Sequence, residues 1–161
     1  MKKLIIVYVV LIVAVILLFI ARGGNNLLSF IPSLGGTSAT AEINGEKINL
    51  LIADSNEERE KGLSGRNKLD DNQGMLFIFE EKGKYPFWMK NMKFSIDIIY
   101  IDENKVAYIV RNAALPSQAP TLNIYTPDAP ANYVLELNAG QADKLKIEKG
   151  TTVKFTNLPK Q

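Results

Sequence analysis

The chain has 161 residues, of which 47% are hydrophobic, and a formal net charge of +2 at pH 7. It contains no cysteine and no histidine, which excludes disulfides, thiolate nucleophiles, Ser-His or Cys-His catalytic pairs and zinc sites built from these residues. Any catalysis would depend on Asp, Glu, Lys, Tyr, Ser or Thr, or on an oxygen-bound metal, and we expect no cofactor. The length predicts one domain together with whatever precedes it.

The first 24 residues have the composition of a membrane anchor. Lys2 and Lys3 precede an uncharged apolar run from Leu4 to Ala21. As a helix, this run would span about 27 Å, close to the hydrocarbon thickness of a bilayer. A cleaved secretory signal has a shorter apolar region of about 7–15 residues, followed closely by a small-residue cleavage site. We therefore predict an uncleaved signal-anchor over residues 1–24, with the lysines in the cytoplasm.

The rest of the chain is then predicted to lie outside the cytoplasm, at the cell surface or in the periplasm. Residues 25–40, which mix Gly, Ser and Asn with one proline, predict a linker, and residues 41–157 predict the globular domain. Without the three basic residues that flank the apolar run, the chain holds 16 basic and 17 acidic residues. No basic run stands out, so we expect no nucleic-acid partner. The expected partners are the membrane and an unidentified small molecule or polymer, and the domain is expected to be monomeric.

The predicted strands of the domain are short and separated by turn residues, as in a sandwich or a barrel. They cover residues 41–43, 47–53, 74–79, 87–90, 95–102, 105–111, 132–137 and 151–155. Asn44-Gly45 predicts a hairpin turn, because both residues tolerate positive φ. Ser55 and Glu58 form the capping-box pattern that opens one short helix, and residues 140–146 predict another. The predicted fold class is mainly β (β-rich α+β), a compact sandwich or barrel-like domain of about eight short strands with two short helices, preceded by one transmembrane helix.

A long connection separates two of these predicted strands. Residues 113–130 hold four of the seven prolines of the chain. A loop of this length inside a compact domain is commonly a functional feature or a lid. The sequence therefore predicts a long loop over residues 113–130 that has a functional role or acts as a lid.

The stretch from Phe87 to Asp102 carries the only tryptophan and places a few polar residues in an apolar run. Strand side chains alternate with period two. This places Ile96, Ile98 and Tyr100 on one face of the 95–102 strand, and Asp97 with two isoleucines on the other. Neither face is polar, so we expect both faces to be covered.

Asp97 is thus predicted to be buried on an apolar strand face. Burying a polar group without a partner is costly, on the order of 2–7 kcal/mol even when the group is neutral. We expect an internal ion pair that tethers the connection around Asn91, with Lys90, Arg59 and Arg66 as the cations to test. A binding or catalytic role for Asp97 is the alternative, because perturbed charges gather at functional sites.

Glu136 is the second carboxylate on a partly apolar strand face. One hypothesis pairs it with Asp97 in a hydrolase of envelope polysaccharide. The two carboxylates of such enzymes stand about 5–5.5 Å apart for retention and about 6.5–9.5 Å apart for inversion of configuration. Asp97 and Glu136 are therefore the candidate catalytic residues.

Five segments of the domain carry a recognisable pattern. They are Glu58-Arg59-Glu60-Lys61-Gly62-Leu63 with Arg66, Gly74-Met75-Leu76-Phe77, Phe87-Trp88-Met89-Lys90-Asn91, Asp97-Ile98-Ile99-Tyr100-Ile101-Asp102, and Tyr133-Val134-Leu135-Glu136 with Ala139-Gly140. In this order, over about residues 41–155, they resemble the bacterial and archaeal family known as domain-of-unknown-function family 192. The resemblance implies a compact β-rich domain, frequently exported, and supplies no activity. Ser64 and Met92 depart from the family, which usually has methionine and often threonine there, so a pocket that these positions line would differ in its ligand.

Our main functional hypothesis is a non-enzymatic, membrane-tethered binding or accessory module for a sugar, a peptide or an envelope component. Such a module needs a concave apolar patch with a few polar groups. The candidate ligand-binding residues are Arg59, Arg66, Trp88, Lys90, Asn91 and Asp97.

A third hypothesis is a Cu(I) site built from Met75, Met89 and Met92, with Trp88 capping the ion. Methionines in apolar strands usually fill the core instead, and no histidine is present to complete such a site. We therefore rank this metal site below the binding module and the hydrolase.

Overall fold

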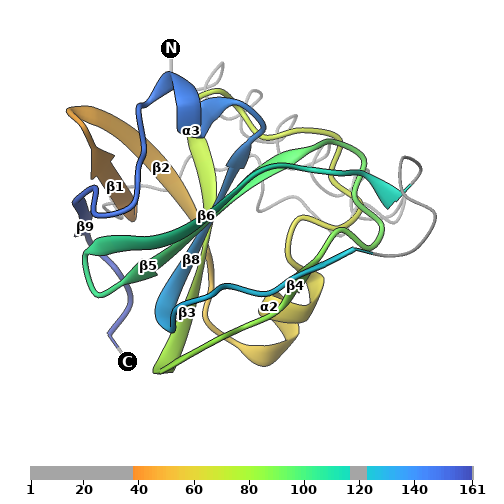
Figure 1. Cartoon of the computed structure of the whole chain (residues 1–161), viewed down its shortest axis with the longest axis horizontal. Helices are drawn as coiled ribbons and strands as arrows, with labels where there is room; N and C mark the ends of the chain where they lie inside the picture. The colour runs from red at the N-terminus through yellow and green to blue at the C-terminus, as the bar shows by residue number, and fades with distance from the viewer. Residues whose placement is uncertain (1–37, 117–122, 161) are drawn as a thin grey trace, which may run out of the picture. The chain divides into compact units, whose positions relative to one another are not determined.

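A computed structural model describes residues 38–116 and 123–160 of the chain (Figure 1). These residues contain nine strands and two short helices. The strands are β1 (Thr40–Ile43), β2 (Glu46–Ala53), β3 (Gln73–Gly83), β4 (Phe87–Trp88), β5 (Ile96–Asp102), β6 (Lys105–Ala113), β7 (Ile124–Tyr125), β8 (Ala131–Asn138) and β9 (Val153–Thr156). The helices are α2 (Asn56–Lys61) and α3 (Gln141–Lys144). The predicted β-rich class with two short helices is confirmed.

The predicted membrane anchor at residues 1–24 lies outside the described residues, as does most of the predicted linker. Within the two described ranges, no helix has the length and apolar character needed to cross a membrane.

Seven of the strands form one sheet in the order β6-β5-β8-β3-β2-β1-β9. Neighbouring strands are antiparallel except β2 and β3, which run parallel and are connected through α2. The sheet curls so far that its two edge strands meet at an antiparallel bridge between Lys105 and Thr152. The backbone N–H of Val153 also donates to the Asn104 carbonyl at 2.9 Å. The domain is therefore a curled, half-barrel sheet rather than a sandwich of two equal sheets.

Both faces of the sheet are buried at its centre, as the alternation in the 95–102 strand predicts. On one face Ile99 and Ile101 pack with Leu135 in a group of buried apolar residues that we call the Leu135 cluster. On the other face Ile98 and Tyr100 belong to a second group, the Tyr100 cluster. Burial of each such side chain stabilises the fold by about 1.5–3 kcal/mol, so two-sided burial accounts for the position of β5 inside the sheet.

The short helix α2 begins and ends as its sequence predicts. The Ser55 hydroxyl accepts a hydrogen bond from the Glu58 N–H at 3.3 Å, and the Glu58 carboxylate accepts one from the Ser55 N–H at 3.1 Å. The helix stops at Gly62, whose φ of 48° is in the range that favours glycine. This reciprocal cap fixes where α2 leaves β2, and hence which helix side chains face the sheet.

Strand β4 is not part of the seven-stranded sheet that contains β5, although only a short connection separates the two strands in the chain. It pairs with β7 in a separate two-stranded sheet, with Phe87 opposite Tyr125 and Trp88 opposite Ile124. β7 lies inside the segment 113–130, which we expected to be a loop throughout. A strand of two residues has no measurable periodicity, so only the pairing with β4 identifies it.

Candidate ligand-binding pocket

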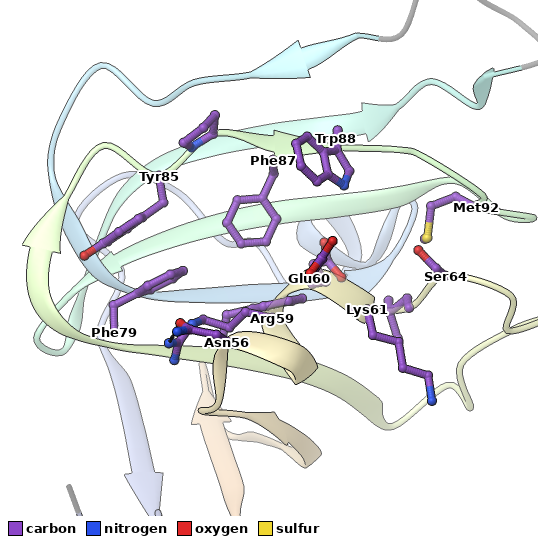
Figure 2. A pocket seen from close by; sticks show the side chains of 15 residues that line it. Asn56, Arg59, Glu60, Lys61, Ser64, Phe79, Tyr85, Phe87, Trp88 and Met92 are labelled. Carbon is purple, nitrogen blue, oxygen red and sulfur yellow. Dashed lines mark hydrogen bonds between the residues drawn. The ribbon is translucent and has the colours of Figure 1, made fainter.

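A cavity of about 260 Å³ lies between helix α2 and strands β3 and β4 (Figure 2). Five of its lining side chains are aromatic: Phe77, Phe79, Tyr85, Phe87 and Trp88. They come from the middle of β3, from the turn after it and from β4. Ligand pockets are usually concave and mostly apolar, with a few polar groups, and this cavity has that character.

The aromatic rings hold one another in place. Phe77 and Phe87 meet edge to face with their centroids 4.9 Å apart, and Phe79 stacks on Tyr85 with centroids 3.6 Å apart. Each such pair contributes about 0.5–1.5 kcal/mol beyond simple burial. Trp88 differs, because 47% of its surface is exposed at the edge of the cavity. The walls are therefore fixed, whereas Trp88 presents an apolar surface to solvent.

One buried carboxyl group, that of Glu136 on β8, also lines this cavity. Its neighbours across the sheet are Met75 on β3 and Ile98 on β5. The residue is only 5% exposed, and its Oε2 atom has no hydrogen-bond partner among the described residues. Leaving a buried polar group unpaired costs about 1–3 kcal/mol, so this carboxyl is an unusual feature of the core.

Burial determines the protonation of Glu136. Removal from water disfavours the charged form and raises the pKa of this carboxyl to about 8. Burial, and secondarily the charge of Glu136, also raises the pKa of the nearby Tyr100 hydroxyl. That hydroxyl donates to the Tyr125 carbonyl at 3.0 Å. At neutral pH the pocket therefore contains a neutral carboxylic acid, able both to donate and to accept a hydrogen bond.

Arg59, a predicted ligand-binding residue, does line the pocket, but its guanidinium is already occupied. It donates to the Ile78 carbonyl at 2.8 Å, to the Asn56 side chain at 2.6 Å and to the Asp54 carbonyl. Its central carbon lies 5.3 Å from the centroid of the Phe79 ring. Arg59 therefore fastens α2 to β3 and forms part of the wall.

Two other charged residues of α2 stand at the cavity. The Glu60 side chain extends toward Trp88, whereas the Lys61 side chain extends away from Phe87 and Trp88 (Figure 2). Glu60 makes no ion pair with any residue that the structure describes. Lys61 makes none either, so the acidic charge of Glu60 is distinguished by its direction toward Trp88 (Figure 2).

The other predicted ligand-binding residues are distributed over two neighbouring cavities. Lys90 and Asn91 line a cavity of about 380 Å³ on another side of Trp88. Arg66 lines a third, of about 540 Å³. Lys61 and Ser64 border all three cavities. Trp88 is thus the predicted residue that the structure places most centrally.

Asp97 is buried as expected, but the ion pair that we expected with Lys90, Arg59 or Arg66 is not found among the described residues. Its Oδ1 accepts a hydrogen bond from the backbone N–H of Asn112 at 2.9 Å. Its Oδ2 accepts one from the backbone N–H of Ala142 at 2.8 Å. The first donor lies in a bulge of β6, where the register with β5 shifts, and the second in the first turn of α3. Two backbone amides hold this carboxylate. The cation with which it interacts is Arg111 rather than one of the three predicted partners, and Asp97 adds to the rise in the Arg111 pKa that the hydrogen bond to Asp143 mainly causes.

Asp97 and Glu136 do not come together as a catalytic pair. Asp97 is on the face of the Leu135 cluster, and Glu136 pairs with Ile98 on the face of the Tyr100 cluster. The two carboxyl groups therefore open to opposite sides of the sheet. Of the three methionines of the copper hypothesis, Met75 and Met89 are buried in the Tyr100 cluster, whereas Met92 is partly buried against it and lines the pocket.

Sequence reasoning missed several residues of the pocket. Glu60 and Phe79 were not singled out, because nothing in the chain shows that α2 packs beside β3. Tyr85 and Phe87 had a signal that was available: with Trp88 they place three aromatic residues within four positions. Such a cluster beside a predicted turn favours an exposed aromatic surface.

Two solved structures are similar to this domain. A protein of unknown function from Novosphingobium aromaticivorans DSM 12444 is 28% identical, with a TM-score of 0.63, over 77% of this chain and 90% of that chain. A protein from Sinorhizobium meliloti 1021, named as a candidate transcription regulator, is 26% identical, with a TM-score of 0.64, over 77% of this chain and 100% of that chain. Among curated proteins no match is found.

A family model extends over the whole pocket. The DUF192 model, described as "Uncharacterized ACR", matches residues 39–155. This range includes α2, β3, β4 and β8, the four elements that contribute side chains to the cavity. The match confirms the resemblance found in the sequence motifs, and the chain belongs to the DUF192 family.

Proposed function

We propose that this protein is a non-enzymatic binding or accessory module, held at the outer side of the membrane by the anchor predicted at residues 1–24. Its ligand, a sugar, a peptide or another envelope component, binds in the aromatic pocket. The observation that carries the proposal is the buried Glu136 carboxyl at the wall of a fixed aromatic cavity, whose Oε2 atom has no hydrogen-bond partner within the described part of the chain. A polar group that the fold leaves unpaired is a natural partner for a ligand.

The exposed Trp88 supports a binding role. An aromatic side chain that is 47% exposed gains little stability from the fold but offers a flat apolar surface to a ligand. Phe87 comes from the same strand and continues this surface into the cavity (Figure 2). Together they suit the apolar face of a sugar ring or the side chain of a peptide.

Catalysis by two carboxylates has less support. The predicted partner of Glu136, Asp97, lies on the opposite face of the sheet and is satisfied by two backbone amides. The other carboxylate that lines the cavity, Glu60 on α2, is exposed and was not the predicted partner of Glu136. We therefore retain the hydrolase only as the alternative that the binding experiment must exclude.

The Sinorhizobium neighbour is named as a candidate transcription regulator, and a regulator that acts by binding nucleic acid would need a basic surface. Outside the apolar N-terminal segment and its flanking residues, this chain has 16 basic and 17 acidic residues. Nucleic-acid-binding domains carry a clustered basic excess. The charge balance therefore favours a ligand other than nucleic acid.

The experiment uses Trp88, which is the only tryptophan of the chain, as the reporter. The full chain in nonionic detergent is titrated with envelope oligosaccharides and peptides while tryptophan fluorescence is followed. We expect a saturable change with at least one class, and at least a tenfold loss of affinity in Phe87→Leu. Phe155→Leu, which alters an aromatic residue on the opposite face, is the matched control.

Two results would contradict the proposal. One is the absence of any saturable fluorescence change across both ligand classes. The other is equal loss of affinity in the two phenylalanine variants, because the effect would then be one of general stability. Release of reducing ends from an oligosaccharide would instead favour the hydrolase.

A further inference from the structure

We propose that the group held in the aromatic pocket is an organic ammonium, either a protonated amine or a quaternary ammonium, seated between the aromatic rings and the Glu136 carboxyl. This inference rests on the binding function proposed above and names the chemical class of the ligand. Three features of the pocket lead to it: the unpartnered carboxyl, the aromatic walls and the signs of the charges at the cavity.

The Glu136 carboxyl supplies the anion that would face the ammonium. Its cross-strand neighbours, Met75 and Ile98, have side chains that cannot donate a hydrogen bond. Its Oε2 atom therefore remains without a partner within residues 38–116 and 123–160. A cation in the cavity that the Glu136 side chain lines would compensate the charge of this carboxyl once it ionises, and the low dielectric of the site would strengthen their attraction.

The aromatic walls favour a cation over an anion. The face of an aromatic ring carries negative potential and attracts an ammonium or guanidinium within about 6 Å of its centroid. The cavity wall already shows one such contact, between Arg59 and Phe79 at 5.3 Å. Phe87 and Trp88 line the cavity from β4, with Trp88 at its exposed edge, and neither makes such a contact with a cation of the described residues (Figure 2). The Phe87 ring also packs edge to face with Phe77 and Tyr100, so the exposed ring of Trp88 is the one more open to a ligand.

The arrangement of the charged side chains around the cavity also favours a cationic ligand. Helix α2 contributes Glu60, which extends toward Trp88, and Lys61, which extends away from it (Figure 2). Arg59, the third charged residue of α2 at the cavity, is held by its hydrogen bonds to Ile78 and Asn56. From β3, β4 and the turn between them, no charged side chain lines this cavity in the part of the chain that the structure describes.

The titratable group of β5 that interacts with Glu136 is the Tyr100 hydroxyl. Burial raises the pKa of this hydroxyl, so it is neutral at neutral pH. It donates to the Tyr125 carbonyl rather than to the carboxyl. Lys61 and Glu60 both line the cavity without an ion-pair partner among the described residues, but only Glu60 extends toward Trp88 (Figure 2). An ammonium between the aromatic rings would complement the carboxyl of Glu136, the buried acid of this cavity.

Cation binding would then be coupled to loss of a proton. Because burial raises the pKa of Glu136 to about 8, the carboxyl is protonated in the empty pocket at neutral pH. The positive charge of the ammonium favours the carboxylate, and the carboxyl proton leaves to solvent. The ammonium keeps all of its bonds to nitrogen, so one cation is taken up and one proton is released. Affinity should therefore weaken, by up to about tenfold per pH unit, as the pH falls below 8.

The test compares choline with its neutral isostere 3,3-dimethyl-1-butanol, which replaces the charged nitrogen by carbon. The full chain in nonionic detergent is titrated with each probe at constant ionic strength, with Trp88 fluorescence as the first readout. Calorimetry at pH 7 in two buffers of different ionisation enthalpy measures proton release as the second. We expect choline to bind at least tenfold more tightly than the isostere and to release close to one proton.

Two variants complete the test. Glu136→Gln keeps the shape of the side chain but cannot ionise, so it should abolish proton release and weaken choline binding at least tenfold. Glu42→Gln, which alters an exposed carboxylate on β1, should change neither. Circular dichroism confirms that each variant is folded. If Glu136→Gln does not fold, the number of protons that the unmodified protein releases on binding choline still decides the test.

The outcomes separate the two proposals. Equal affinity for choline and its isostere, or binding of choline without proton release, overturns the ammonium site. If neither probe binds while a neutral sugar or peptide changes Trp88 fluorescence, the ammonium site is wrong and the binding module stands. If no compound of any class binds, both proposals fail.

Discussion

Glu136 on β8 and Asp97 on β5 occupy adjacent strands but are one position out of register, because Glu136 is opposite Ile98 and Asp97 is opposite Leu137. Directly opposite residues share a face of a sheet and successive residues alternate. The two buried carboxyl groups therefore lie on opposite faces. Asp97 is fully hydrogen-bonded by the backbone, whereas Glu136 opens to the aromatic pocket. This single offset separates a structural carboxylate from a candidate functional one.

Replacing Asp97 should destabilise the domain through the backbone amides that it binds. In Asp97→Asn, one of the N–H groups of Asn112 and Ala142 loses its acceptor or meets the donor end of the new amide. We expect a loss of about 2–3 kcal/mol in the free energy of unfolding. Urea titration of the full chain in nonionic detergent, followed by far-UV circular dichroism, measures it.

The same urea titration tests whether Lys90 contributes to stability through an ion pair with Asp97. Lys90 is exposed and forms no ion pair with Asp97 in the described residues. Lys90→Met should therefore change stability by less than about 0.5 kcal/mol, and the double variant should be additive. A coupling energy above about 1 kcal/mol would reinstate the ion pair.

Glu136 should make stability depend on pH in the direction opposite to most acidic groups. Its pKa is about 8 in the folded protein and 4.5 in the reference state, so between these values the native state holds a proton that the unfolded chain has released. Stability therefore falls as the pH rises through this window, by about 1.4 kcal/mol per pH unit for a single group. Glu136→Gln cannot titrate and should lose this dependence.

The measurement is the difference in unfolding free energy between the unmodified protein and Glu136→Gln, at pH 5, 6, 7 and 8. The free energy of unfolding of Glu136→Gln, relative to that of the unmodified protein, should increase at each step in pH. This difference should become constant above pH 8. Parallel stability curves would mean that Glu136 titrates normally and is therefore solvated. Such a result would also remove the physical basis of the proposed pocket chemistry.

Arg59 should contribute to stability rather than to ligand charge recognition. Arg59→Met removes the donor from the Ile78 carbonyl and from the Asn56 side chain. Hydrogen bonds to charged groups contribute about 1.5–3 kcal/mol, so we expect a loss within this range. Hydrogen exchange should also quicken in α2, which Arg59 fastens to β3. Arg66→Met is the matched control, because Arg66 is exposed and should change stability by less than about 0.5 kcal/mol.

The anchor predicted at residues 1–24 should keep the protein in the membrane. We expect the full chain of 161 residues in the membrane pellet after high-salt and carbonate washing, with an intact mass that includes Met1 or Lys2. A soluble fragment that begins after Ala21 or Ala41 would instead establish a cleaved signal peptide.

Local patterns in the sequence determined much of this architecture. The alternation in residues 95–102 predicts both buried faces of β5, and it separates Asp97 from Ile98 and Tyr100. The Ser55–Glu58 capping box predicts where α2 begins. The alternation in residues 132–137 predicts that Glu136 lies on a partly apolar strand face. In each of these cases the signal lies within a few residues of the structure that it predicts.

Tertiary structure alone decided which segments meet. Asp97 binds amides that lie 15 and 45 residues away in the chain, and every non-proline residue carries such an amide, so no residue type marks the partner. β4 and β7 are too short to show a period, and only their pairing defines them. The pocket draws on α2, β3, β4 and β8, whose packing depends on the curl of the sheet. Side-chain periodicity specifies the face on which a residue lies, but not the element that will cover it.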